Sequence, residues 1–290
     1  MPTVNANGIG TWYELRGAGP MLVLCHGWLG PTDDWPPGLL EALEPHHRLL
    51  VYDVRGHGRT AAPEDPDAYS LPTYAQDLRA LLDALGVERA HICGSSQGGM
   101  IAAQFAVDCP ERTRSLLLCD STAGNSVDEG PGGEFERTLR DAFELMERMA
   151  VEEGLAALCE RRIAYDMEND PHYYDFPEPP DLRQERDRQR YARLTLHAFV
   201  GTNRAIRNRP DLTARLPQLQ MPALVLVGEW DGFRPCAERD HRLIEGSRFV
   251  LVRRSGHSAP SWRPDVFVRA VTEFIADVEA GREVAGEFEA

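Results

Sequence analysis

A serine between spaced glycines is the residue of this sequence best suited to nucleophilic chemistry. Residues 91–100 read HICGSSQGGM, with adjacent serines at Ser95 and Ser96. Glycines two residues before and two residues after Ser96 would let a tight strand-to-helix turn hold it in an unfavourable backbone conformation without steric collision. The spacing therefore predicts that Ser96 is a nucleophile and that the backbone amide of Gln97 points at the same site.

A serine hydroxyl needs a base to accept its proton, and the pKa of histidine suits that task near neutral pH. Of the nine histidines, His257 directly follows an apolar run and stands in a glycine turn, SGHS. His57 also lies beside glycines, in DVRGHG, but we interpret that loop as structural, and His26 as a brace for its own loop. We therefore predict that His257 is the base.

Three acidic residues compete to orient the imidazole of this histidine. Asp231, in GEWDGFRP, follows the preceding apolar run and gives the chain order Ser, Asp, His. Asp120 ends the apolar run RSLLLCD, and Glu229 lies two residues before Asp231. We expect Asp231 to be the acid, with Asp120 and then Glu229 as alternatives.

The motif CHGWLG, residues 25–30, indicates where an oxyanion could be stabilised. Acyl transfer passes through a tetrahedral intermediate, and two backbone amides from separate loops can hold its negative charge without rearrangement. We assign these donors to the backbone N–H groups of Trp28 and Gln97. The indole of Trp28 is also expected to line the substrate pocket.

Short apolar runs separated by helical patterns would position these residues. The chain begins with a hairpin signal at Asn7-Gly8, and its final helical pattern covers 265–281. Buried strands are expected within 21–28, 48–58, 90–96, 114–122, 222–231 and 248–257. Alternation of strands and helices predicts an α/β fold with a mostly parallel central sheet flanked by helices. The acidic residues after the final helix are expected to be frayed.

The segment 122–219 interrupts this alternation with helical patterns alone. We divide the chain into a core of residues 1–121 and 220–290 and a helical cap of residues 122–219, inserted after the sixth strand. Such an insertion would cover the carboxyl ends of the strands, where open α/β sheets bind ligands; the alternative is a surface decoration without a role in the site. The expected pocket lining is Trp28, Phe135, Leu139, Phe143, Tyr173 and Tyr174.

Composition excludes several classes of function. The formal net charge of −15 disfavours binding to nucleic acid or to an anionic membrane surface, since both attract proteins with excess Lys and Arg. No signal peptide and no apolar run of about 20 residues occurs, so we expect a cytoplasmic protein. The six cysteines form no C-x-x-C pair and are expected to be buried, reduced thiols. No pattern typical of metal ligands is present, and we expect neither a metal nor a cofactor.

Taken together, the motifs resemble those of the α/β-hydrolase superfamily. HGW, DVRGHG, GSSQGG, GEWDGFRP and SGH follow one another in the order typical of that superfamily, and the likeness covers residues 3–280. The core is similar to bacterial esterases, carbon-carbon hydrolases and, above all in DALGVERAHICGSSQGGM and PERTRSLLLCDSTA, 3-oxoadipate enol-lactonases. The insertion departs from this likeness in its PHYYDFPEPPDL patch and its arginine-rich run, so the resemblance does not indicate the substrate. A serine at the elbow disfavours the dehalogenase and epoxide-hydrolase branches, which attack with a carboxylate.

The expected activity is that of a cofactor-free serine hydrolase, which cleaves a small carboxylic ester or lactone through an acyl-enzyme on Ser96. Two alternatives use the same three residues: a carbon-carbon bond hydrolase and a perhydrolase. A third alternative is a non-catalytic ligand receptor that has kept the fold. The expected partner is a small-molecule substrate, and the protein is expected to be a monomer or a homodimer.

Overall fold

The computed structural model describes residues 2–125 and 131–290, so residues 126–130, in the loop expected to open the segment 122–219, lie outside it. Within the described chain, nine strands form one sheet in the order β1-β2-β4-β3-β5-β6-β7-β8-β9. The strands are β1 (Thr3–Ala6), β2 (Ile9–Gly17), β3 (Met21–Cys25), β4 (Arg48–Tyr52), β5 (Ala90–Ser95), β6 (Thr113–Cys119), β7 (Ala223–Gly228), β8 (Arg248–Val252) and β9 (Gly286–Glu289).

The sheet is parallel from β4 onward, as predicted. β1 pairs antiparallel with β2 through a turn at Asn7 and Gly8, both with positive φ, and β2 pairs antiparallel with β4. The remaining pairs are parallel. Parallel strands bring their carboxyl ends to one edge of the sheet, so the loops after β3, β5, β7 and β8 meet there.

The expectation that the C-terminal residues are frayed is wrong. β9 pairs with β8 in parallel from Arg248↔Gly286 to Leu251↔Glu289. Beyond this ladder, the backbone N–H of Arg253 donates to the carbonyl oxygen of Ala290 at 2.7 Å, and the Arg253 guanidinium bonds the Glu289 carboxylate. β8 would otherwise expose a row of unpaired backbone groups, and the acidic tail satisfies them.

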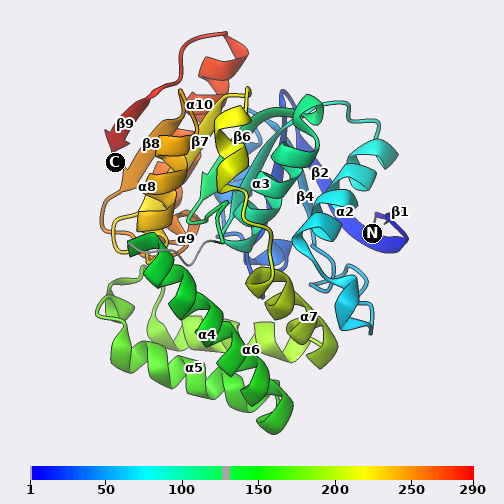
Figure 1. The fold of residues 1–290 in the computed structure, drawn as a ribbon, viewed down its shortest axis with the longest axis vertical. Helices are drawn as coiled ribbons and strands as arrows, with labels where there is room; N and C mark the ends of the chain where they lie inside the picture. The colour runs from blue at the N-terminus through cyan, green and yellow to red at the C-terminus, as the bar shows by residue number, and fades with distance from the viewer. Residues whose placement is uncertain (1, 126–130) are drawn as a thin grey trace.

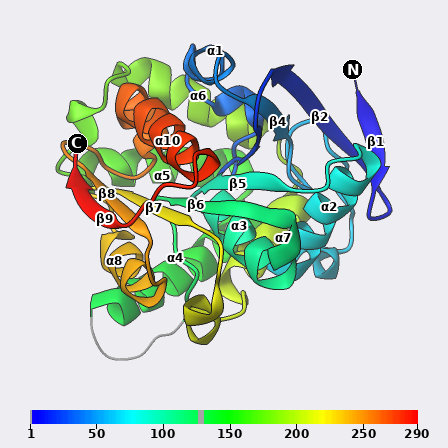
Figure 2. The same ribbon diagram turned by 90° about the horizontal axis from the view of Figure 1, so that it is seen from above.

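Two layers of helices cover the sheet (Figure 2). α1 and α10 lie on one face, in the core cluster that contains Leu22 and Leu24, whereas α2, α3 and α8 lie on the other face, in the cluster that contains Val23. This alternation along β3 is the period of two expected for a strand that is buried on both faces. The helices of the core are α1 (Leu39–Leu43), α2 (Leu71–Ala84), α3 (Gln97–Asp108), α8 (Arg234–Leu243), α9 (Ala259–Trp262) and α10 (Pro264–Glu279).

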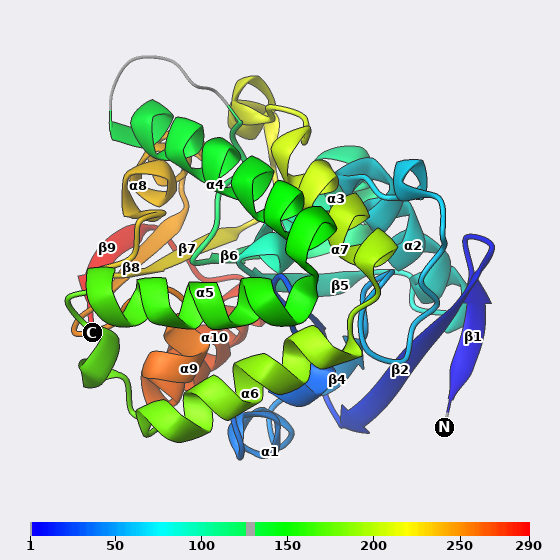
Figure 3. The same cartoon turned by 90° about the horizontal axis from the view of Figure 1, so that it is seen from below.

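The helices between β6 and β7 form a separate group below the sheet in Figure 1. They are α4 (Pro131–Glu153), α5 (Leu155–Asn169), α6 (Pro180–Arg193) and α7 (Leu196–Arg207). Figure 3 shows them side by side across the carboxyl-end edge of the sheet. The charged run of residues 183–200 is divided between α6 and α7. The Thr195 hydroxyl, which follows the break, accepts the N–H of Ala198 and caps α7.

Two further findings concern the cysteines and the apolar character of the helices. All six cysteine side chains are buried, as predicted. In residues 2–125 and 131–290 no helix combines the length and the apolar character that a bilayer-spanning helix needs.

A buried ion pair ties the segment that enters the inserted helices to the segment that leaves them. Glu136 of α4 is 0% exposed and bonds the guanidinium of Arg209, which is 5% exposed and follows α7. Arg209 also donates to the carbonyl oxygen of Gly124 at 3.0 Å, and the N–H of Leu212 donates to that of Ala123 at 3.0 Å. The two crossings between the core and the inserted helices are therefore held together.

Replacing Arg209→Met should lower the free energy of unfolding by about 3 kcal/mol or more, because it leaves the Glu136 carboxylate buried without its partner. The control is Arg188→Met, which breaks an exposed pair with Glu160 on α5 and should cost about 1 kcal/mol or less. Urea denaturation followed by circular dichroism measures both. Equal losses in the two variants would contradict the role assigned to the buried pair.

Candidate active site

Ser96 stands in a strained turn between β5 and α3. Its φ of 55° and ψ of −120° lie in a region that residues with a side chain rarely adopt. A Cβ on Gly94 would lie 2.0 Å from the carbonyl oxygen of Gly98, and one on Gly98 would lie 2.0 Å from that of Cys25. Both glycines are thus sterically required where α3 starts against β3 and β5, as their spacing predicted.

The side chains of Ser96, His257 and Asp231 form a hydrogen-bonded chain. The Oγ of Ser96 lies 3.0 Å from Nε2 of His257, and Nδ1 of His257 lies 3.1 Å from both carboxylate oxygens of Asp231. A carboxylate only accepts, so Nδ1 carries the hydrogen when the imidazole is neutral and Nε2 can accept the serine proton. The N–H of Phe233 donates to the Asp231 carboxylate at 3.0 Å and fixes its orientation.

Burial and charge act in opposite directions on the pKa of His257. Burial lowers it, but the hydrogen-bonded Asp231 carboxylate more than offsets this and raises the pKa from 6.5 to about 9. Asp120 adds to the rise, whereas the positive charge of Arg162 on α5 opposes it. The Asp231 carboxylate therefore favours the protonated imidazole, and the neutral form that can accept the serine proton becomes more populated as the pH rises.

An Asp231→Asn substitution should bring the pKa of His257 below its ordinary value of about 6.5, because burial then outweighs the remaining attractive charge. The measurement is an NMR titration of the imidazole Cε1–H signal in the wild type and the variant. Glu229→Gln is the matched control: its carboxylate bonds Arg253 and the N–H of Arg254, so the pKa of His257 should not change. An unchanged pKa in the Asp231 variant would contradict the assignment.

The two alternative acids lie elsewhere. Asp120 is fully buried, and its carboxyl group accepts the N–H of Gly228 at 3.0 Å and that of Ala259 at 2.6 Å. Burial raises the pKa of Asp120 well above its ordinary value. Glu229 bonds Arg253 at the surface. Neither carboxyl group bonds His257. Asp120 instead holds the backbone at Gly228, just before the loop that carries Asp231, and at Ala259, just after the loop that carries His257.

The residues assigned as oxyanion donors lie next to the serine. Trp28 follows β3, and Gln97 is the first residue of α3. A Cβ on Gly27 would lie 3.4 Å from that of Ser96, which places this loop against the turn. The backbone N–H groups of Trp28 and Gln97 make no hydrogen bond to another described residue. Both are therefore available to a ligand at Ser96.

The two histidines interpreted as structural are buried beside this loop. Nε2 of His26 accepts the N–H of Val54 at 2.8 Å, and Nδ1 of His57 lies 3.1 Å from the carbonyl oxygen of Arg55. Their rings contact one another at 5.2 Å. His26 thus links the loop after β3 to the segment after β4.

An apolar cavity of about 610 Å³ reaches Ser96 and His257 from the side of α4 and α5. Three of the expected pocket residues line it, Trp28, Leu139 and Phe143. The sequence did not single out the other apolar residues that line it, which are Met100, Ala142, Leu145, Met146, Met149, Leu158, Tyr165, Ile206 and Phe233. The indole N–H of Trp28 donates to Oδ1 of Asn203 on α7 at 2.9 Å, and its ring meets Phe143 edge-on.

Three expected pocket residues do not line this cavity, and the expectation is corrected. Phe135 lies at the start of α4, where it packs on the ring of Phe233 at 4.7 Å. Tyr173 is buried among the inserted helices, and Tyr174 is 67% exposed. Phe135 shares a helix face with Leu139, but it lies at the end of α4 that packs on the core beside α8.

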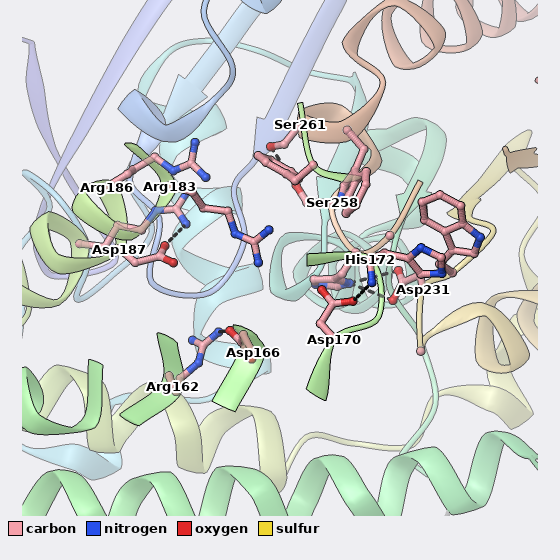
Figure 4. A pocket seen from close by; sticks show the side chains of 17 residues that line it. Arg162, Asp166, Asp170, His172, Arg183, Arg186, Asp187, Asp231, Ser258 and Ser261 are labelled. Atoms are coloured by element: carbon pink, nitrogen blue, oxygen red, sulfur yellow. Dashed lines mark hydrogen bonds and ion pairs between the residues drawn. The ribbon is translucent and has the colours of Figure 1, made fainter. Parts of the chain in front are cut away.

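A second cavity, of about 400 Å³, adjoins His257 on the opposite side and is polar. Figure 4 shows arginine and aspartate side chains of α5 and α6 facing Asp231, Ser258 and Ser261 of the core. A third cavity, of about 210 Å³, lies between Ser96 and the loop that carries Trp28. Arg162 of α5 borders all three. No motif of the sequence distinguishes these arginines from those of a solvated helix.

Comparison with known protein families places this geometry in context. The model of the alpha/beta hydrolase fold matches residues 20–264, which is most of the chain. The chain belongs to the α/β-hydrolase family. The nine-stranded sheet, its two helix layers and the serine turn after β5 are then features of that fold.

Several relatives within the α/β hydrolases align over nearly the whole chain. A putative 2-succinyl-6-hydroxy-2,4-cyclohexadiene-1-carboxylate synthase of Bacillus subtilis is 30% identical and covers 96% of this chain and 100% of its own. A pimeloyl-[acyl-carrier protein] methyl ester esterase of Aeromonas salmonicida is 30% identical, covering 90% and 98%. The crystal structure of the enol-lactonase from Burkholderia xenovorans superposes with a TM-score of 0.77 at 25% identity, covering 95% and 100%.

Proposed function

We propose that this protein is a serine hydrolase that cleaves a small carboxylic ester or lactone through an acyl-enzyme on Ser96. The hydrogen-bonded chain from Ser96 through His257 to Asp231, which opens onto three cavities, is the observation that carries the proposal. The relatives support a hydrolase that acts on ester bonds, since they include a methyl ester esterase and an enol-lactonase.

Acylation begins with a proton transfer within this chain of residues. Neutral His257 takes the hydroxyl proton of Ser96 at Nε2 while Oγ attacks the carbonyl carbon of the substrate. The carbonyl oxygen becomes an oxyanion, which the backbone N–H groups of Trp28 and Gln97 stabilise. Asp231 holds the imidazole in the required tautomer and stabilises its cationic form.

Departure of the alcohol completes acylation, and attack by water then begins deacylation. The tetrahedral intermediate collapses, the C–O bond to the leaving alkoxide breaks, and that alkoxide takes the proton from His257. A water molecule then gives a proton to His257 and attacks the acyl carbon. The second intermediate releases the carboxylic acid and returns the proton to Ser96.

The inserted helices serve this site as a cap in the proposal. Residues 122–219 supply one wall of each cavity that contains His257, and the core of residues 1–121 and 220–290 supplies the other. Leu139 and Phe143 of α4 face Ser96 across the apolar cavity, and Arg162 of α5 borders both it and the polar one. A surface decoration would not share walls with the reactive serine.

A fluorophosphonate probe should label the wild-type protein once per chain and should not label Ser96→Ala. The same substitution should lower kcat on short-chain phenyl esters and lactones by at least about 10⁴-fold, because the nucleophile is lost. Mass spectrometry locates the label. Absorbance of the released phenol measures turnover of the phenyl esters, and acid release at constant pH measures turnover of the lactones. An unlabelled wild type would indicate a non-catalytic ligand receptor, whereas labelling with turnover of 1,3-diketones alone would indicate a carbon-carbon hydrolase.

Asp231→Asn should lower kcat by about 10³-fold or more, because the amide favours the wrong tautomer of His257. Asp120→Asn changes a group that bonds only the backbone, so it should lower the melting temperature and reduce kcat by less than about tenfold. Steady-state kinetics and thermal unfolding of both variants test this assignment. Loss of turnover confined to the Asp120 variant would reverse it.

A further inference from the structure

The polar cavity beside His257 gathers charged side chains of both signs, and these differ in how fully they are paired. Its described lining includes Arg162, Arg183, Arg186 and Arg190 together with Asp166, Asp170, Asp187 and Asp231. Equal numbers of opposite charges make the cavity formally neutral before His257 is counted. Whether it binds an anion or a cation therefore depends on which groups already have partners.

The aspartates are largely engaged. Asp231 bonds the imidazole of His257, and Asp187 bonds Arg190 at 3.1 Å. Asp170 accepts the backbone N–H of His172 at 2.9 Å. Arg190 is itself engaged twice, because it also bonds Asp34 of the core at 2.5 Å.

Arg183 of α6 makes no ion pair within 4 Å to a described carboxylate, although its charge opposes the rise that burial causes in the pKa of the nearby Asp166 carboxyl. Its guanidinium donates to the carbonyl oxygen of Tyr173 at 3.3 Å, and it stacks over the ring of Tyr173 at 4.2 Å and near that of Phe176 at 5.0 Å. Stacking on aromatic rings restricts a guanidinium without using up its N–H donors. Most of its donors are therefore free in a site that is already ordered.

Arg162 of α5 lies over the ring of Trp28 at 5.2 Å, makes only long hydrogen bonds, and lines two cavities together with Ser96. Its guanidinium is 3.5 Å from the carboxylate of Asp166 and 3.3 Å from the hydroxyl of Tyr191, both at the long end of hydrogen bonding. Its charge is close enough to His257 to lower the pKa of that imidazole. A ligand group in the polar cavity can thus reach Arg162 while another part of the same ligand reaches Ser96.

The neighbouring Arg186 adds positive charge that is incompletely balanced. It bonds Glu178 at 2.5 Å, but its Nε is buried without a partner among the described residues. Burial, followed by the like charge of Arg190, lowers the pKa of Arg186. An anion bound nearby would offset both effects, since it would satisfy a buried donor and reduce the repulsion between two guanidinium groups.

We propose that the polar cavity binds a carboxylate of the substrate through Arg183 and Arg162. The substrate is then an ester or lactone with a free carboxylate on one side of the scissile bond and an apolar group on the other. A guanidinium matches a carboxylate in charge and in planar geometry. The apolar group occupies the larger cavity, lined by Leu139 and Phe143. This inference rests on the proposed ester hydrolysis at Ser96.

Two pairs of esters test the inference, each pair differing by a carboxylate in place of a methyl group. Phenyl hydrogen glutarate is compared with phenyl pentanoate, which varies the acyl side. 4-Carboxybenzyl pentanoate is compared with 4-methylbenzyl pentanoate, which varies the leaving side. In at least one pair, kcat/KM of the carboxylate ester should exceed that of its methyl partner by about tenfold or more, because a charged hydrogen bond is gained.

Arg183→Gln should reduce this preference by about tenfold, mainly through a higher KM of the carboxylate ester. Arg162→Gln should reduce it too and should move the pH profile of kcat/KM to higher pH, because a charge that lowers the pKa of His257 is removed. Arg188→Gln is the matched control: it lies on α6, bonds Glu160 and lines none of the three cavities, so the preference should stay unchanged.

Different results would contradict carboxylate binding in the polar cavity and ester hydrolysis at Ser96. Ser96-dependent hydrolysis that favours the methyl esters in both pairs would overturn the inference alone, as would equal losses for both members of a pair in Arg183→Gln. If no ester is turned over and no label is found on Ser96, the proposed function fails. Calorimetry with phenyl hydrogen glutarate and the Ser96→Ala protein then decides the inference, because binding should be lost when Arg183→Gln is added.

Discussion

The backbone of Ser96, held at a positive φ between β5 and α3, is the constraint on which the arrangement of the site depends. It brings the start of α3 so close to the backbone of β3 and β5 that neither Gly94 nor Gly98 could carry a Cβ. Such a conformation costs on the order of 1–3 kcal/mol and persists only where the surroundings fix it. Here α3 is buried over nearly its whole length, and this burial offsets the strain.

Parallel strands turn that local constraint into a site. Because β3, β5, β7 and β8 end at the same edge, the loops after them place Trp28, Ser96, Asp231 and His257 within reach of one another. Asp120, at the end of β6, joins the loops after β7 and β8 by accepting two backbone N–H groups. The sheet determines which loops are neighbours, and the buried carboxyl group of Asp120 fixes the backbone of two of these loops.

The parts of the site that lie on strand ends could be predicted from the sequence, because their positions follow from local pattern and chain order. Ser96, Asp231 and His257 each follow a strand, and the structure brings their side chains together. The pocket walls could not be predicted in the same way. Helical spacing put Phe135 and Leu139 on one face of α4, but only the packing of that helix on the core decides which of them reaches the cavity. The pairing of β9 with β8 could not be predicted either, because it depends on the free edge of a strand that is distant in the sequence.

The role of the arginines of the polar cavity could not be predicted from the sequence either. Arg183, Arg186 and Arg190 recur at spacings of three and four residues and so share one face of α6, whereas Arg188 lies on another. In the sequence alone this run is typical of a solvated helix. Only contact with α5 and the core shows that one of its faces is enclosed. A charge pattern identifies a helix face, and tertiary packing decides whether that face meets water or a substrate.

The ion pair between Glu136 and Arg209 has a consequence for how this protein could be rebuilt. The segment that leaves the core and the segment that returns to it are bonded to each other beside this ion pair. Helices α4–α7 can therefore be exchanged as a single module that includes both Glu136 and Arg209. Ser96, His257 and Asp231 all lie outside that module. A transplant would replace the walls that α4–α7 supply to the apolar and the arginine-lined cavities in one step, while these three side chains stayed in place.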